Sequence, residues 1–262
     1  MTTRIFAVAN QKGGVGKTTT SVNLTASLAA TKRRVLLVDL DPQGNATMGS
    51  GVEKRDLPRS SFDVLMGECD ASAAIQRLPE LGYDLIPANA DLTGAEVGLI
   101  EEIGRELRLR NALAEVTSQY DYVIIDCPPS LNMLTVNALV AAHSVIIPTQ
   151  CEYYALEGLS ALVETIDKIR RYLNADLQIE GLQRTMFDPR NNLSNQVSQQ
   201  LIKHFGNKVY RTIIPRNVRL AEAPSHGLPA LIYDKSSNGA KAYLALAGEM
   251  LRRDESMVSS LN

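Results

Sequence analysis

The 262-residue sequence predicts a single α/β domain, a mostly parallel twisted β-sheet with helices on both faces. Short runs rich in Val, Ile and Leu alternate with helical stretches along the chain, an order typical of parallel strands joined by helices. The content of 45% hydrophobic and 21% charged residues is ordinary for a globular protein. Because no repeat, low-complexity tract or linker divides the chain, we expect one domain over 1–253 and a frayed polar tail over 254–262.

The spacing of apolar residues predicts the strands and helices in chain order. The first strand, 4–10, leads into a glycine-rich stretch, and small and apolar residues recur at helical spacing over 18–31. The continuous apolar run 34–41 suits a strand that is covered on both faces. The remaining expectations are a weaker strand 83–88, a helix 93–116, strands 120–129 and 143–150 with a helix 130–142 capped by Ser130 between them, a helix 154–173, a strand 177–187, a helix 195–206 closed by Gly206, a strand 209–215 and a helix 238–253.

The sequence carries no recognisable secretory signal and no membrane span. The first ten residues lack a cleavage-site pattern, and no stretch approaches the roughly 18 apolar residues of a span. The three cysteines, Cys69, Cys127 and Cys151, are odd in number and lack CxxC spacing. This pattern favours reduced thiols in the cytosol over a disulfide framework, so we expect a cytoplasmic protein.

Charge is distributed unevenly along the chain. The formal net charge is −2, yet the segment from Arg184 to Arg253 holds 11 Lys and Arg against 4 Asp and Glu. The rest of the chain holds 16 against 25. Such asymmetry indicates an anion-binding face, although a solvated basic surface is the alternative.

The stretch "NQKGGVGKTT", residues 10–19, lies between a predicted strand and a predicted helix. Glycines in such a turn let backbone N–H groups converge on phosphate oxygens, and the helix N-terminus adds its dipole. Lys17 is expected to reach the β- and γ-phosphates of a nucleotide, and the Thr18 hydroxyl to bind Mg²⁺. The usual pattern has Gly at position 11, where this chain has Gln11, and the loop carries a second lysine, Lys12.

Acidic residues at strand ends complete the predicted metal site. Asp126 closes "YVIID", where an aspartate can orient a water on Mg²⁺. Asp39 and Asp41 close "LLVDLD"; Asp39 is equally consistent with a cap of the next turn, whereas Asp41 can reach the crevice at the carboxyl edge of the sheet. Many ATPases carry a glutamate base after the aspartate that occupies the place of Asp126, but here the residue is Cys127. Asp41 is therefore the best candidate for the group that activates water.

These motifs, taken together, match a known pattern. "KGGVGKTT" with Lys12, "DLDPQGNAT" and "YVIIDCPPSL" resemble the deviant Walker A, second nucleotide and Walker B motifs of the ParA/MinD ATPases. "PTQCEYYALEGL", "MFDPR" and "TIIPRNVRLAEAPSHGLPALIYDKSSNGAKAYLALA" resemble the chromosomal ParA (Soj) branch of that family. The resemblance runs from Arg4 to about Arg253 and implies a P-loop NTPase fold with ATP and Mg²⁺ as cofactors.

The resemblance implies a weak, partner-stimulated ATPase that forms a homodimer with ATP sandwiched between the subunits. Lys12 would contact phosphates bound by the other subunit, and Gly13 would lie where the two subunits press together. Asp41 would position the attacking water. Glu152 matches a residue that touches the partner's nucleotide, with a surface loop acid as the alternative. The implied nucleotide contacts are Lys12, Gly13, Gly14, Val15, Gly16, Lys17, Thr18, Thr19 and Glu152, with Pro215 and Asn217 near the adenine and Thr18, Asp41 and Asp126 at the metal.

The resemblance also implies macromolecular partners. Arg190 and Arg219 match positions that bind DNA in the ATP dimer, and both lie in the basic segment. Contacts to phosphates would make binding to double-stranded DNA independent of sequence and steeply dependent on salt. A ParB-like centromere-binding protein would stimulate hydrolysis, and a bacterial nucleoid would be the site of action. The DNA-binding surface formed by Arg190 and Arg219 would be extended by four lysines of the same segment, for which a solvated surface position is the alternative: Lys203, Lys208, Lys235 and Lys241.

Two features of other ParA/MinD members are not expected in this chain, and two other functions are alternatives to DNA segregation. Only nine residues precede Asn10, so an N-terminal helix-turn-helix for operator-specific repression is not expected. The last residues lack the basic amphipathic helix of MinD-type members, so membrane docking is not expected. A ParA-like ATPase that positions a protein cargo or cycles on a membrane remains an alternative. An iron–sulfur reductase like the nitrogenase iron protein is another, but Cys127 and Cys151 lack the Gly-rich context that its cluster ligands have.

Overall fold

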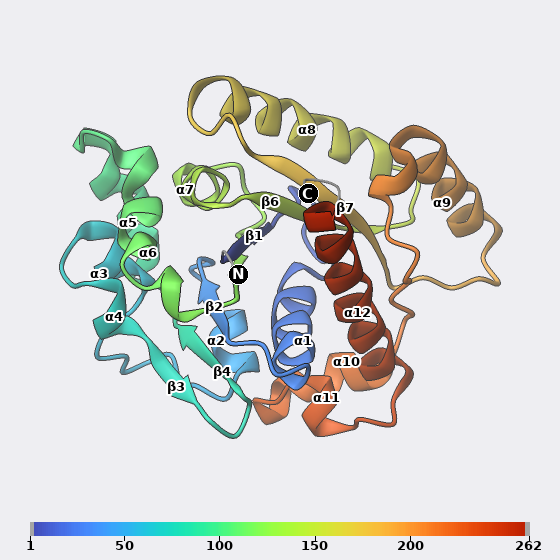
Figure 1. Cartoon of the computed structure of the whole chain (residues 1–262), viewed down its shortest axis with the longest axis horizontal. Coiled ribbons are helices and arrows are strands. Elements are labelled where there is room, and N and C mark those ends of the chain that lie inside the picture. The colour runs from blue at the N-terminus through green and yellow to red at the C-terminus, as the bar shows by residue number, and fades with distance from the viewer. Residues whose placement is uncertain (1–2, 260–262) are drawn as a thin grey trace.

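The computed structural model describes residues 3–259, with side chains for 3–255, and contains one seven-stranded sheet. The strand order is β3-β4-β2-β5-β1-β6-β7 (Figure 1). All neighbouring strands run parallel except β3 and β4, which are antiparallel. The strands are β1 Arg4–Val8, β2 Val35–Asp39, β3 Gln76–Leu78, β4 Tyr83–Ile86, β5 Tyr122–Asp126, β6 Ser144–Gln150 and β7 Gln178–Thr185.

Helices connect the parallel strands, as expected for crossovers in such a sheet. The α-helices are α1 Lys17–Ala30, α2 Asn45–Gly49, α3 Ser61–Met66, α4 Ala71–Ala74, α5 Leu92–Gly98, α6 Arg108–Ala114, α7 Met133–Ala141, α8 Ala155–Tyr172, α9 Asn192–Phe205, α10 Val218–Glu222, α11 Ala230–Tyr233 and α12 Asn238–Ser259. Short 3₁₀ turns are η1 Leu99–Glu101, η2 Arg105–Leu107, η3 Thr117–Gln119, η4 Gly206–Lys208 and η5 Ala223–His226.

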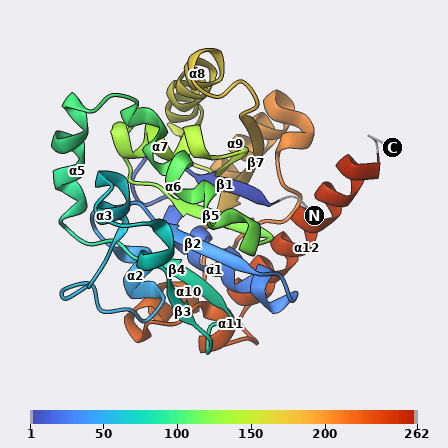
Figure 2. The ribbon, with the colours of Figure 1, turned by 60° about the vertical axis from the view of Figure 1, so that its left-hand side comes forward.

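The sheet separates two hydrophobic cores because successive side chains of a strand point to opposite faces. In β1, Ile5 and Ala7 pack with α3 and α5–α9, whereas Phe6 and Val8 pack with α1, α2 and α10–α12. Figure 2 accordingly shows α7 and α8 above the strands and α1 and α11 below them. Strands buried on both faces explain why their sequences read as continuous apolar runs.

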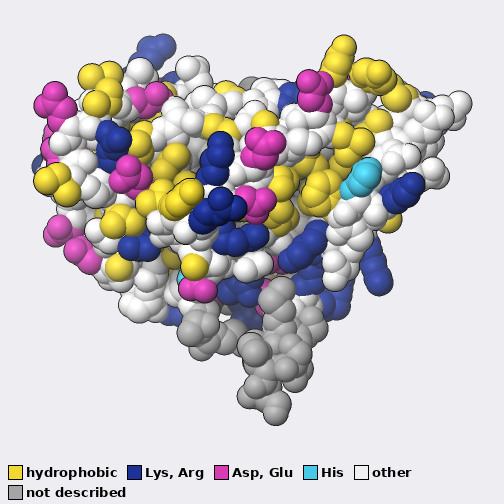
Figure 3. Space-filling view, turned by 90° about the horizontal axis from the view of Figure 1, so that it is seen from above, with side chains coloured by type: hydrophobic (Ala, Val, Ile, Leu, Met, Phe, Trp, Pro, Cys, Tyr) yellow, Lys and Arg dark blue, Asp and Glu magenta, His cyan; other side chains and the backbone are white. Residues whose placement is uncertain are grey.

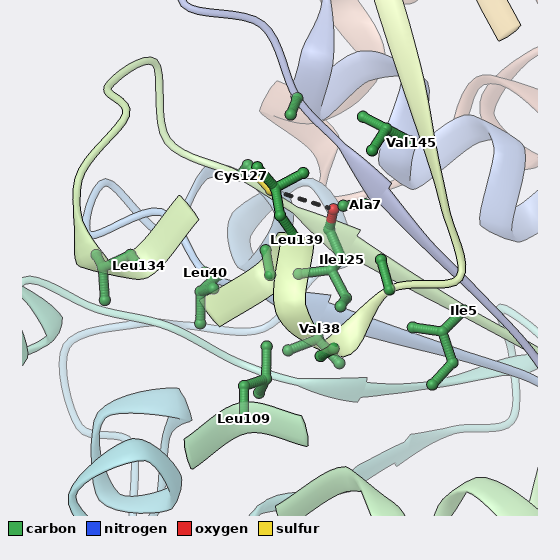
Figure 4. Packing of buried hydrophobic residues seen from close by; sticks show 14 of the residues in the cluster. Ile5, Ala7, Val38, Leu40, Leu109, Ile125, Cys127, Leu134, Leu139 and Val145 are labelled. Carbon is green, nitrogen blue, oxygen red and sulfur yellow. Dashed lines mark hydrogen bonds between the residues drawn. The ribbon is translucent and has the colours of Figure 1, made fainter. Parts of the chain in front are cut away.

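The first core is formed by apolar side chains from the strands and the helices above them. Figure 4 shows Ile5, Val38 and Ile125 from the sheet facing Leu109 of α6 and Leu139 of α7. All of these side chains are buried. The fold class predicted from sequence, a single mostly parallel α/β domain covered on both faces, is confirmed.

The helix predicted over 93–116 is wrong as one element. The segment is instead broken between α5 and α6, and Gly104 adopts φ 71°, in the left-handed region. A residue in that region cannot continue a right-handed helix, and only glycine adopts it at little cost. The neighbouring Ile103 is 98% exposed, so no core contact holds this segment in a helix.

Three other local expectations also differ from the structure. Asn132, not Ser130, caps α7, since its side chain accepts a hydrogen bond from the Thr135 amide. The segment 209–215 makes isolated bridges to Leu182 of β7 and to Phe187 beyond it. It is no strand, because the amides of Arg211 and Thr212 donate to the Glu249 carboxylate instead of a neighbouring strand. The helix predicted over 238–253 extends to Ser259, so 254–259 is helical, and the rest of the predicted tail lies outside the described residues.

Helix α12 packs along α1 on the second face of the sheet (Figure 1). Its side chains Tyr243, Leu246 and Met250 are buried in the core there. The Thr20 and Tyr243 hydroxyls lie 3.1 Å apart and hydrogen-bond to one another. Within residues 3–259, no helix has both the length and the apolar character needed to cross a membrane.

Candidate functional site at the carboxyl edge of the sheet

The glycine-rich loop joins the end of β1 to the first residue of α1, Lys17. Gly14 and Gly16 have φ values of 72° and 87°, which a side chain would strain. Gly16 is also the N-cap of α1, so no side chain caps the helix and its first amides remain open to an anion. The loop therefore has the backbone conformation that a phosphate-binding turn needs.

Two residues that sequence reasoning did not single out hold this loop in place. Asn10 accepts a hydrogen bond from the Lys12 amide at 3.0 Å and donates to the Pro148 carbonyl of β6 at 2.7 Å. Thr185, the last residue of β7, donates its hydroxyl to the Val15 carbonyl at 2.8 Å. Asn10 belongs to the quoted loop motif, whereas no local pattern marks Thr185, which lies 170 residues from its partner.

The two lysines of the loop have different partners. Lys17 is buried, and its Nζ donates to the Lys12 carbonyl at 3.1 Å. Burial lowers the pKa of Lys17, although the nearby carboxylates of Asp126 and Asp41 oppose this shift. Lys12 lies at the surface, where its Nζ is 2.6 Å from Oε2 of Glu152, a residue of the segment between β6 and α8. One ammonium therefore faces the inside of the loop and the other faces outward.

Two aspartates meet at the carboxyl ends of adjacent strands. Asp39 of β2 and Asp126 of β5 are register partners, and Val8 of β1, just before the loop, pairs with Asp126 on its other side. The Ser21 hydroxyl of α1 donates to Asp126 Oδ1 at 2.7 Å, while Asp126 Oδ2 is buried and has no hydrogen-bond partner in the described part of the chain. Burial, and next the charge of Asp39, raises the pKa of Asp126.

This arrangement suits a hard divalent cation. Thr18, in the first turn of α1, is close enough to Asp126 to lower the pKa of its carboxyl group, and Asp126 Oδ2 has no hydrogen-bond partner among the described residues. Carboxylate and hydroxyl oxygens are the ligands that Mg²⁺ prefers. A cation there would offset the repulsion between buried carboxylates, so the residues present are compatible with Mg²⁺.

Asp39 and Asp41 have separate environments in the structure. Asp39 is fully buried and accepts from the amide and hydroxyl of Thr47 at 2.8 and 2.7 Å, which anchors the turn leading into α2. Asp41 is 7% exposed and accepts from the Gln43 amide at 2.9 Å. Asp41 also acts electrostatically on Lys17 and Asp126. Asp41 thus lies near the loop and accepts fewer hydrogen bonds from the protein than Asp39 does.

The two residues predicted to lie near the adenine, Pro215 and Asn217, belong to the segment between β7 and α10 and not to the glycine-rich loop. Pro215 forms an isolated parallel bridge with Phe187, and Asn217 is the N-cap of α10. The Oδ1 atom of Asn217 is buried and has no hydrogen-bond partner among the described residues. A Cβ on Gly239 would lie 3.0 Å from it, so glycine at 239 leaves room for this side chain.

Comparison with known proteins gives this site its family. A family model described as an AAA domain matches residues 3–179. The sporulation initiation inhibitor protein Soj of Bacillus subtilis is 56% identical over 94% of this chain and 98% of its own. The chromosome partitioning protein ParA of Myxococcus xanthus is 52% identical over 96% of this chain and 89% of its own. This chain belongs to the ParA family of chromosome-partitioning ATPases.

A solved structure supports the same fold for this ParA-family chain. It is described as cobyrinic acid a,c-diamide synthase from Mycobacterium smegmatis with bound ADP and magnesium. It is 43% identical, with a TM-score of 0.85, and the match covers 97% of this chain and 96% of that one. The P-loop fold class expected from the sequence is therefore confirmed for this ParA-family chain.

Cys127 of this ParA-family chain follows Asp126 at the carboxyl end of β5, but its side chain is buried in the first core. All three cysteines are free thiols, and Cys127 and Cys151 are buried. The Cys127 thiol donates to the Ile125 carbonyl inside the first core (Figure 4). Burial raises the pKa of Cys127, and it raises that of Cys151 to about 11. Neither thiol is disposed to act as a base or as a thiolate ligand near neutral pH.

The two arginines proposed for DNA contact are both exposed and paired. Arg190 precedes α9, its side chain is 89% exposed, and it forms a two-pronged ion pair with Asp188 at 2.8 and 2.9 Å. Hydrogen bonding to Arg190 lowers the pKa of Asp188 to about 2. Arg219 of α10 pairs with Glu222 at 2.8 Å and with Asp234 at 3.3 Å. Neither arginine contacts the nucleotide loop in the structure.

Proposed function

We propose that this chain is a chromosome-partitioning ATPase in which ATP switches a monomer to a DNA-bound sandwich homodimer. The observation that carries the proposal is the outward position of Lys12 beside a phosphate loop that already has Lys17 inside it. A loop that serves only its own nucleotide needs one such lysine. We infer that the second lysine serves a nucleotide held by another subunit.

Within one subunit, the loop residues Gly13 to Thr19 cradle the phosphates of ATP, with Lys17 supplying positive charge at the β- and γ-phosphates. Thr18 and Asp126 hold Mg²⁺, and Asp41 adds a carboxylate at the same site. When bound, Mg²⁺ neutralises the phosphate charge that develops as the γ-phosphoryl group leaves. Asp41 orients the attacking water, because the residue after Asp126 is a buried, protonated thiol and not a carboxylate.

The adenine end of the nucleotide is assigned to Pro215 and Asn217. The buried, unsatisfied Oδ1 of Asn217 is an acceptor that the amino group of a purine can satisfy. Leaving a buried hydrogen-bond acceptor without a partner costs free energy. A nucleotide whose base donates a hydrogen bond to Asn217 Oδ1 is therefore favoured over one whose base has no donor at that position. The same residue stands at the N-cap position of α10, so binding at Asn217 links the nucleotide to the helix that carries Arg219.

Dimerisation is assigned to the outward side of the loop. Lys12 and Glu152 form an ion pair within one chain, with side chains 38% and 47% exposed. In the ATP dimer this ion pair breaks, and both side chains instead contact the nucleotide bound by the partner subunit. Gly13 lies at the same surface, where any side chain would stand between the two subunits.

The ATP dimer is proposed to bind double-stranded DNA without sequence preference through Arg190 and Arg219. Phosphates would compete for these guanidiniums with the surface carboxylates that hold them now, and such exposed ion pairs are weak. A ParB-like protein stimulates hydrolysis and thereby releases the DNA. The site of action is then the nucleoid in the bacterial cytoplasm.

Partitioning is preferred to amide synthesis because two relatives named chromosome partitioning protein ParA are 52% and 51% identical, against 43% for the structure described as a diamide synthase. A membrane-cycling ATPase is less well supported, because the apolar face of α12 over Tyr243–Met250 is buried against the second core.

The test is DNA binding by the purified chain with ADP, ATP and a slowly hydrolysed ATP analogue over a salt series. Binding is expected only with ATP or the analogue, with affinity falling steeply as salt rises. Arg190→Ala and Arg219→Ala should each lower affinity and reduce the salt slope by about one. Arg171→Ala, which removes an exposed charge from α8, is the matched control.

Two outcomes would contradict this assignment. Binding that ignores the nucleotide would contradict the switch, and binding that ignores salt would contradict phosphate contacts. Co-sedimentation with anionic liposomes under the same conditions tests the membrane alternative. Sedimentation with ATP in the absence of DNA binding would favour that alternative.

A further inference from the structure

A pocket of about 620 Å³ lies between η4, the segment after it and the C-terminal half of α12, away from the nucleotide loop. The polar residues that line it include Arg184, Tyr210, Arg211, Glu249, Arg252 and Arg253. Figure 3 shows Lys and Arg side chains on the lower part of one face of the molecule. The lining of this pocket therefore contains four guanidinium groups and one carboxylate.

Arg184 is the buried cation of this pocket. It is 6% exposed, and its guanidinium donates to the Ser198 hydroxyl at 2.9 Å and to the Tyr210 carbonyl at 2.8 Å. These partners are neutral, and the Nε atom of Arg184 is buried without a hydrogen-bond partner among the described residues. A buried charge without an ion pair is costly, and an anion next to it would offset that cost.

Glu249, the acid of the lining, does not fill this role. Its carboxylate accepts from the amides of Arg211 and Thr212, both at 2.8 Å, and from the Arg253 guanidinium at 3.0 Å. Its charge is thus committed to the backbone of the segment after η4 and to Arg253. The pocket keeps an excess of positive charge.

Arg211 and Arg252 are exposed at this pocket. In the part of the chain that the structure describes, no hydrogen bond or ion pair engages either guanidinium. The Arg253 guanidinium lies over the Tyr210 ring at 4.2 Å, and the Tyr210 hydroxyl is buried with no hydrogen-bond partner among residues 3–255. Ile202 and Val209 provide apolar surface in the same pocket. The pocket thus combines exposed cations, a buried cation and an apolar wall.

We propose that this pocket binds a compact phosphorylated small molecule whose phosphate is held by Arg211, Arg252 and Arg184. Guanidinium groups present fixed pairs of donors that match phosphate oxygens, and such charge-assisted bonds are among the strongest in proteins. A free phosphate ester can enter the pocket and approach Arg184. Duplex DNA carries its phosphates on a rigid cylinder and would contact only Arg211 and Arg252.

Calorimetric titration with pyrophosphate tests the proposal on the full chain, saturated with ADP and Mg²⁺ so that the phosphate loop is occupied. Saturable binding is expected, and Arg211→Ala combined with Arg252→Ala should weaken it tenfold or more, about the effect of losing one charged hydrogen bond. Lys168→Ala combined with Arg171→Ala removes two exposed charges from α8 and should leave binding unchanged. Arg184→Met should also weaken it, with circular dichroism to check folding.

Several results would overturn the proposal. One is the absence of a saturable site, and another is pyrophosphate binding that displaces ADP, because it would place the anion in the phosphate loop. An equal loss in both double variants would indicate general charge attraction and no built site. If a duplex DNA of 24 base pairs loses affinity in the Arg211/Arg252 variant while pyrophosphate does not bind, the pocket arginines belong to the DNA surface.

Discussion

The ε-ammonium of Lys12 lies 2.6 Å from Oε2 of Glu152, a residue 140 positions away in the chain. The ion pair joins the phosphate loop to the segment ahead of α8 within one subunit. Because both side chains are partly exposed, the pair contributes only about 0–1 kcal/mol to stability. Because the ion pair is weak, Lys12 can leave Glu152 at little cost in free energy and contact a nucleotide in a second subunit.

Lys12→Ala is expected to leave ATP binding by the monomer intact and to abolish ATP-dependent dimerisation. The reason is that Lys12 points away from the interior of the loop, where Lys17 lies. A fluorescent ATP analogue measures binding, and light scattering after size exclusion measures the dimer. Lys168→Ala, on the exposed face of α8, controls for loss of a surface charge. Dimers of Lys12→Ala at wild-type ATP concentrations would refute the assignment.

Gly13→Val is expected to fold normally and to lose the ATP dimer. A Cβ at Gly13 meets no heavy atom within 4 Å, and its φ lies outside the left-handed region, so nothing within one chain requires glycine there. Gly14→Val is the contrasting variant, because its φ of 72° should cost about 1–3 kcal/mol. Thermal melting and light scattering distinguish the two effects. A Gly13→Val protein that dimerises would show that the subunits do not meet at this residue.

Asp41→Ala is expected to retain ATP binding, to slow hydrolysis by about 10²–10⁴-fold and to accumulate as a DNA-bound dimer. Asp41 is near the loop and makes few structural hydrogen bonds, so its removal should spare the fold. Lys17→Ala is the comparison, since losing the buried loop cation should abolish ATP binding itself. Phosphate release and DNA mobility shift measure the two outcomes. Normal turnover by Asp41→Ala would exclude it as the group that positions water.

The stability of the nucleotide-free protein is expected to fall as pH rises from about 4 to about 8 through the buried pair Asp39 and Asp126. Burial raises the pKa of both carboxyl groups in the folded state above the ordinary value of about 3.9. Between the unfolded and folded pKa values the folded state binds more protons, so raising the pH destabilises it. Urea melts of wild type and Asp126→Asn check this.

The Asp126→Asn variant should show a flatter dependence on pH, because its amide does not titrate. Adding ADP with Mg²⁺ should also flatten the wild-type curve, since a cation at the carboxylates favours their charged form. An identical pH slope in wild type and Asp126→Asn would mean that other groups set the dependence.

Local sequence was sufficient where backbone chemistry alone decides the structure. The loop glycines and the closing Gly206 of α9 are found where the patterns place them, and the strands predicted over 34–41 and 120–129 are present but end earlier, at Asp39 and Asp126. Two local patterns failed for different reasons, one where a partner outside the segment competed and one where a glycine within the segment interrupted the helix. The apolar run 209–215 has strand-like residues, but its amides bond to Glu249 of α12, and Gly104 breaks a stretch with helical spacing.

The sequence by itself determined the fold class, the family and the identity of the loop residues, because periodicity and short motifs are encoded within a few neighbouring positions. Only the tertiary structure decided that Lys12 meets Glu152, that Thr185 holds the loop, and that Arg184 lies buried in a cavity with three other arginines. These contacts join residues far apart in the chain. They exist because the strand order and the packing of α12 bring the segments together, which no local pattern records.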